Sequence, residues 1–102
     1  MRFHANRSRV STSGTSVALS AATGAPAATS RVQWIKISAR TGNSGVIYVG
    51  DSSVSSTLGY ELSANDSIEI NFQDAGGTVT LNTIYVDASA NNQDADWAVI
   101  LE

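Results

Sequence analysis

Short runs in which apolar and polar residues alternate constrain the fold of this chain more than any other feature. The run SIEINFQ (67–73) is the clearest, because every second residue is apolar: Ile68, Ile70 and Phe72. A period of two is typical of a strand with one buried and one solvated face. No segment has the i, i+3, i+4, i+7 spacing of an amphipathic helix over three turns. We therefore expect an all-β protein.

Five further runs of β-branched and aromatic residues are predicted as strands. They are TSVALS (15–20), VQWIKISAR (32–40), VIYVG (46–50), TIYVDA (83–88) and DWAVILE (96–102). The last run has apolar residues on both of its faces, so it should be a covered strand in which Trp97 belongs to the core. Tyr85 is the second aromatic residue that we expect in the core.

The alternation also predicts which side chains of 32–40 share a face. One face should carry Ile35, Ile37 and Ala39, and the opposite, partly covered face should carry Val32, Trp34 and Lys36. Clusters of turn residues separate the strands, and TGNSG (41–45) is predicted to be a hairpin whose tip needs positive φ. SAND (63–66) and DAGG (74–77) are predicted to do the same.

A chain of 102 residues is long enough for one core. Many short strands with turn residues between them indicate an antiparallel β-sandwich, and we favour a jelly-roll-like topology over residues 15–102. The 42% of hydrophobic residues supports a folded chain. The absence of cysteine excludes a disulfide framework, so stability should come from packing.

The first 14 residues are expected to form a flexible, basic N-terminal arm. All six basic residues of the chain precede all nine acidic ones, and Arg2, Arg7 and Arg9 lie in this arm. Such an arm can lie on an acidic surface of a neighbouring copy or of a larger assembly. Nucleic acid is an improbable partner, because residues 10–102 carry three basic and nine acidic groups, a sum of −6. Deleting residues 1–9 should leave the fold intact.

No residue pattern indicates an enzyme. His4 is the single histidine, and no nucleophile, phosphate-binding loop or dinucleotide fingerprint accompanies it. Oxygen ligands of the kind that calcium prefers occur at Asp87, Asn91, Asp94 and Asp96, but the loop lacks the glycine and the bidentate glutamate of an EF-hand. We therefore predict no catalytic residue, cofactor or metal. We also expect no signal peptide and no membrane span.

The stretch GVIYVGDSSVSSTLGYELSANDSIEI (45–70) resembles a segment of small virion proteins of tailed bacteriophages. The shared order is an IYVG strand, a serine-rich loop, a GY.L element, a turn and an SI.I strand. IYVD (84–87) and WAVI (97–100) also fit the pattern, so that the resemblance covers roughly residues 32–86 and the C-terminal strand. It implies a β-rich capsid decoration or cement protein, often a trimer, that sits on the outer shell and ties capsomers together.

The expected function is therefore non-enzymatic binding of the major capsid protein at the capsid surface, after assembly in the host cytoplasm. The predicted contact residues are Arg2, Arg7 and Arg9 in the arm and Ser52, Ser53 and Tyr60 in the loop 52–60. A carbohydrate-binding or adhesin-like module of a tail fibre is the alternative, because exposed aromatic residues stack on sugar rings. A minor head or tail component of the same virion is a third possibility.

Overall fold

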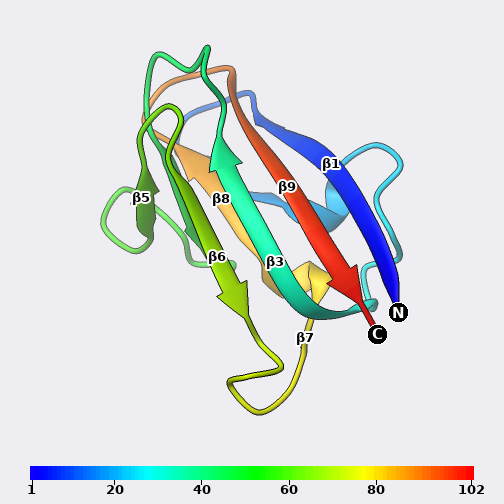
Figure 1. Ribbon diagram of the computed structural model, residues 1–102. Helices are drawn as coiled ribbons and strands as arrows, with labels where there is room; N and C mark the ends of the chain where they lie inside the picture. Colours follow the sequence, from blue (N-terminus) through cyan, green and yellow to red (C-terminus); the bar gives the residue numbers. More distant parts are fainter.

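The protein consists of two antiparallel sheets packed face to face, and the computed structural model describes all of residues 1–102 (Figure 1). Sheet A has the order β1-β9-β3-β6, with β7 also paired to β3, and sheet B has the order β2-β8-β4-β5. The strands are β1 (Arg2–Val10), β2 (Val17–Ala18), β3 (Arg31–Ala39), β4 (Ile47–Gly50), β5 (Tyr60–Leu62), β6 (Ser67–Asn71), β7 (Val79–Thr80), β8 (Tyr85–Ala88) and β9 (Gln93–Leu101). Two short 3₁₀ turns, η1 (Leu19–Ala21) and η2 (Leu81–Thr83), complete the secondary structure. The predicted all-β sandwich is confirmed, and the jelly-roll assignment stays a prediction.

The core lies between the two sheets and is built from the inward residues of both. The strand β9 lies between β1 and β3 in sheet A, and its inward residues Trp97, Val99 and Leu101 are buried. The core position predicted for Trp97 is confirmed, whereas Tyr85 is only half-buried and lies outside the core cluster. The outward residues Ala98 and Ile100 of β9 are half-buried.

The expectation of a flexible arm over residues 1–14 is wrong. Arg2–Val10 forms β1, which pairs along its whole length with β9, from Arg2 opposite Leu101 to Val10 opposite Gln93. In Figure 1 β1 lies beside β9 as one edge of the front sheet. This strand was not predicted because its inward side chains are mostly polar, so that apolar and polar residues do not alternate clearly along it. The sandwich therefore includes the N-terminal residues.

A β-bulge in β3 changes the predicted faces of that strand. Val32 pairs with Leu101 and Trp34 pairs with Ile100, so Gln33 is an extra residue between two consecutive partners on β9. A bulge of this kind resets the alternation by one position. Val32 therefore points into the core together with Ile35, Ile37 and Ala39, and its predicted place beside Trp34 and Lys36 is wrong.

None of the three predicted hairpin turns connects paired neighbours. TGNSG (41–45) carries the chain from β3 in sheet A to β4 in sheet B, and its glycines have no positive φ. SAND (63–66) crosses from sheet B to sheet A, and DAGG (74–77) joins β6 and β7 along the same edge of β3. Positive φ does occur in these two, at Asn65 and Gly76.

Candidate functional site

The predicted contact residues fall into two groups at opposite edges of the sandwich. Arg2, Arg7 and Arg9 stand on β1, at one edge of sheet A. Tyr60 begins β5, and Ser52 and Ser53 lie in the loop before it, at the edge of sheet B that is remote from β2. The fold therefore brings the loop residues together but does not bring the arginines to them.

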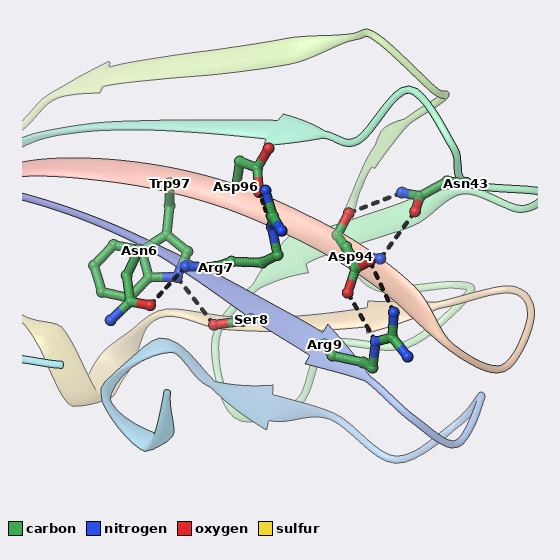
Figure 2. Close-up of polar contacts among 8 residues, drawn as sticks. All are labelled: Asn6, Arg7, Ser8, Arg9, Asn43, Asp94, Asp96 and Trp97. Carbon is green, nitrogen blue, oxygen red and sulfur yellow. Dashed lines mark hydrogen bonds and ion pairs between the residues drawn. The ribbon is translucent and has the colours of Figure 1, made fainter. Parts of the chain in front are cut away.

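Two of the three arginines are paired with aspartates of the neighbouring strand (Figure 2). Arg7 Nε donates to Asp96 Oδ1 over 2.6 Å, and Arg9 donates through Nε and one terminal nitrogen to the two oxygens of Asp94, over 2.9 and 3.1 Å. These hydrogen bonds raise the pKa of Arg7 and of Arg9, and the bond from Arg9 lowers the pKa of Asp94. The positive charge of β1 is therefore largely neutralised within sheet A.

The aspartate that binds Arg9 is also tied to the loop after β3. Asn43 Nδ2 donates to the backbone oxygen of Asp94 over 2.8 Å, and the Asp94 amide donates to Asn43 Oδ1 over 2.9 Å (Figure 2). The Asp94 side chain is only 15% exposed. These contacts hold β1, β9 and the crossover to sheet B together, which gives Asp94 a structural role.

Two more of the oxygen-bearing residues in the segment 87–96, Asp87 and Asn91, accept hydrogen bonds from backbone amides. Asp87 Oδ1 accepts from the amides of Gly14 and Ala88, and Asn91 Oδ1 accepts from the amide of Ser13. These bonds fix the turn between β1 and β2 on the end of β8. No group of three or more His, Asp or Glu side chains is arranged to hold a metal ion.

His4, the single histidine, is held in sheet A as part of β1. Its ring centroid lies 5.7 Å from that of Trp97, and Nε2 is 3.2 Å from the Asn6 amide nitrogen. Asn6 in turn donates to the backbone oxygen of Thr23 over 3.1 Å. These residues close the space between sheet A and the loop after η1.

The loop 51–59 is ordered by bonds within itself. The Asp51 carboxylate accepts from the Ser53 amide over 2.8 Å, and the Asp51 backbone oxygen accepts from the Val54 amide. Ser55 and Leu58 exchange backbone bonds of 3.1 and 3.3 Å, and the buried Val54 anchors the loop from inside. The loop thus holds Tyr60, which is 59% exposed, at a fixed place on the surface.

An apolar hollow of about 330 Å³ opens beside Tyr60, between the free edges of the two sheets. We call it the edge groove. Its wall on the side of sheet A comes from β6 and β7, and its wall on the side of sheet B comes from β4, β5 and the segment before β8. The lining residues are Val49, Gly50, Asp51, Tyr60, Ile68, Ile70, Phe72, Val79, Thr83 and Ile84.

The groove exists because the two sheets end differently at this edge. β6 is an edge strand, and β5, the last strand of sheet B, has only three residues. The inward side chains of Ile68, Ile70 and Phe72 are therefore only half-buried, although their predicted inward face is confirmed. Sequence reasoning assigned them to the core, because alternation identifies an inward face but not how far the opposite sheet extends.

The predicted loop residues lie near the groove to different degrees. Tyr60 lines it directly. Ser53 lines an adjoining open hollow with Leu58 and Gly59, and the two hollows share Gly50 and Asp51. Ser52 is exposed and lines neither.

The charged side chains on the elements that form the edge groove are negative. Asp51 is part of its lining, and Glu61 and Glu69 stand on β5 and β6. Residues 41–102 contain no lysine, arginine or histidine, so none of the elements from β4 to β9 contributes a positive side chain. The site can bind an apolar group and attract a basic one.

Comparison with known proteins gives no match to a protein-family model, to a curated protein sequence or to a solved structure. No helix of the protein has the length and apolar character needed to cross a membrane.

Proposed function

We propose that the protein is a non-enzymatic virion component of a tailed bacteriophage that decorates the capsid and stabilises the shell by binding the major capsid protein. The observation that best supports this proposal is which part of the sequence forms the edge groove. The stretch 45–70, which resembles phage virion proteins, supplies β4, the loop 51–59, β5 and β6, and thereby most of the groove lining.

The physical character of the groove supports a binding role. Apolar side chains that are left half-buried at an open edge gain free energy when a partner covers them. Tyr60 offers a large ring and a hydroxyl at the rim, and aromatic residues of this kind dominate the energetics of many interfaces. The loop that holds Tyr60 is fixed by its own hydrogen bonds, so little conformational entropy is lost on binding.

The arginines of β1 belong to a second proposed contact at the opposite edge of the molecule. Arg7 and Arg9 are already paired, whereas Arg2 makes no ion pair within the chain. In this proposal the molecules on the shell form a homo-oligomer, with a trimer favoured, and the basic edge meets the capsid or a neighbouring copy. The protein would act on the capsid surface of the virion.

Cosedimentation with empty capsids of the phage that encodes the chain tests the proposal. Tyr60→Ser should weaken binding at least about tenfold, because the ring contributes buried area at the rim of the groove. Tyr60→Phe is the matched control, because it keeps the ring, which belongs to a residue that is 59% exposed in the free protein, and removes only the hydroxyl, so it should bind nearly as well as wild type. A wild-type protein that stays in the supernatant would contradict the capsid role.

The alternative role in carbohydrate binding has one observation in its favour. On the outer face of sheet A, Phe3 pairs with Ile100, which pairs with Trp34, so that two aromatic residues flank an aliphatic one across three strands. Trp34 Nε1 lies 3.4 Å from Glu69 Oε2, which adds a polar group beside the row. A glycan array probed with wild type and Trp34→Ala tests this role, which predicts sugar binding that the substitution removes.

A minor head or tail component would share the proposed binding mode but would differ in the number of copies per particle. A decoration protein should be present in hundreds of copies per particle, and a minor component in few. Quantitative mass spectrometry of purified particles distinguishes them.

A further inference from the structure

The edge groove lies beside an edge strand whose outward backbone groups have no partner. The Ala39 amide donates to the backbone oxygen of Asp66, and the backbone oxygen of Gln33 accepts from the Phe72 amide, so these two pairs are hydrogen-bonded pairs of the ladder between β3 and β6. In an antiparallel strand the backbone N–H and C=O groups of successive residues point alternately toward and away from a given neighbour. The backbone groups of Ile68 and Ile70 therefore bond to β3. The amides and carbonyls of Ser67, Glu69 and Asn71 then point away from the sheet.

No other segment of the chain forms hydrogen bonds with these backbone groups. β6 pairs with β3 only, and none of the backbone hydrogen bonds formed outside the strand ladders uses the amide or carbonyl of Ser67, Glu69 or Asn71. An open row of this kind is a template for one more strand. The edge of β5 is a poorer template, because it offers only Tyr60–Leu62.

A strand added to β6 would also cover the edge groove. Every second side chain of the new strand would point to the inner side of sheet A, where Ile68 and Ile70 are half-buried and Tyr60 faces them from sheet B. These inward side chains must be apolar to fill the hollow. The remaining side chains would lie on the outer face, in line with Glu69.

The negative charge near the groove favours basic side chains at the outward positions of the added strand. Asp51, Glu61, Asp66, Glu69 and Asp74 lie in or next to the elements that form the groove. The nearest basic residue in the sheet is Lys36, which is opposite Glu69 on β3 and forms no ion pair with it. Lysine or arginine at the outward positions of the new strand would complement this surface.

We propose that the edge groove binds an extended segment of a partner protein, in which apolar residues alternate with basic ones, as an additional strand on β6. This inference rests on the proposed function in that the capsid protein would supply the segment. The backbone bonds to Ser67, Glu69 and Asn71 give the segment its register, and the apolar side chains that enter the groove give it affinity.

Selection from a yeast-displayed library of random nine-residue peptides tests this proposal without capsids. The selected peptides should alternate apolar with lysine or arginine residues. On addition of a selected peptide, the amides of Ser67, Glu69 and Asn71 should become protected from hydrogen exchange in NMR spectra. Selection of no such pattern, or protection at other amides only, would overturn the proposal.

Two substitutions at one position separate the backbone contact from the side chain. Glu69→Pro removes an outward amide that β3 does not use, and proline is tolerated at such edge positions. Glu69→Ala keeps the amide and removes only the charge. Binding of the selected peptide should fall at least about tenfold more in Glu69→Pro than in Glu69→Ala. Equal affinities of the two variants would refute strand addition.

A modified peptide provides the same test on the unchanged protein. N-methylation of every second residue, at the amides that face β6, should abolish binding, whereas N-methylation of the alternate amides should not. Similar binding of both peptides would refute the proposal even if Glu69→Pro failed to fold. A wild-type protein that binds the peptide as predicted but ignores capsids would contradict the capsid role and leave strand addition intact.

Discussion

Trp97 donates its indole N–H to the hydroxyl of Ser8 over 2.9 Å, and this bond joins the last strand to the first across 89 positions of the chain. Both residues are only 2% exposed. The bond satisfies the one polar atom of a ring that otherwise belongs to the apolar core (Figure 2). Because a buried donor without a partner is costly, Ser8 fixes β1 in place more firmly than its small side chain indicates.

Ser8→Ala should therefore destabilise the protein by about 1–3 kcal/mol, the cost of leaving a buried N–H unsatisfied. Urea unfolding followed by tryptophan fluorescence measures this change. Ser52→Ala is the control, since Ser52 is exposed and forms no hydrogen bond, and it should lie within about 0.5 kcal/mol of wild type. Equal unfolding midpoints for the two variants would contradict the role of Ser8.

Removal of residues 1–9 should destabilise or unfold the domain, contrary to the expectation from sequence. The truncation deletes nearly all of β1, which leaves one edge of β9 without hydrogen-bond partners and exposes Trp97. A domain of this size has a total stability of about 5–15 kcal/mol, so the loss of a strand is a large fraction of it. Circular dichroism during urea unfolding provides the measurement. A truncated protein with the midpoint of the full chain would show that β1 is dispensable.

The pair of Arg9 and Asp94 should make stability depend on pH in the acid range. The pKa of Asp94 is lower in the folded protein than the value near 3.9 that is usual for an unfolded chain. Its contribution is therefore fully present above the unfolded pKa and is lost as the pH falls through the folded pKa. The difference in unfolding free energy between wild type and Asp94→Asn should shrink as the pH is lowered below about 4.

Arg9→Gln provides the matching variant, because it removes the hydrogen bond that lowers the pKa of Asp94. Its deficit relative to wild type should shrink over the same acid range. Urea unfolding at a series of pH values measures both deficits. A difference between wild type and Asp94→Asn that does not change between neutral and acid pH would contradict this account.

A side chain at Gly59 should be destabilising, because a Cβ at that position would lie 2.8 Å from Val54 Cγ2 and 3.1 Å from Tyr48 Cβ. Gly59→Ala should cost about 1–3 kcal/mol by overpacking and should displace Tyr60 next to it. Gly77→Ala is the control, since a Cβ there meets nothing within 4 Å. Thermal unfolding of the two variants decides the matter, and equal melting temperatures would show that the packing around Gly59 adapts freely.

Alternation of apolar residues predicted the strands that the core covers, and it failed where other forces hold a strand. β3, β4, β6, β8 and β9 were all found from their side-chain pattern. β1 was missed because its inward side chains are mostly polar. It is held in part by Arg7 and Arg9, which pair with Asp96 and Asp94 on the outer face. The sequence did contain a signal, because Arg7 and Arg9 are two residues apart, as are Asp94 and Asp96. This equal spacing allows two ion pairs between neighbouring strands, but it identifies those strands only once their register is known.

The candidate site was predictable in part for a similar reason. Tyr60 stood out as an aromatic residue in an irregular segment, and it does line the edge groove. Ile70 and Phe72 were assigned to the inward face, but their incomplete cover depends on the shortness of β5 in the other sheet. Such a relation between two sheets follows from the tertiary fold and is absent from any local pattern. The bulge at Gln33 is hidden in the same way.

Hydrogen–deuterium exchange of the protein, free and bound to empty capsids, tests most directly whether the edge groove is the binding site. Binding should slow exchange in Tyr60–Leu62 and Ser67–Asn71, the two strands at the open edge. Capsid binding that leaves exchange in both strands unchanged would show that the capsid contacts another surface.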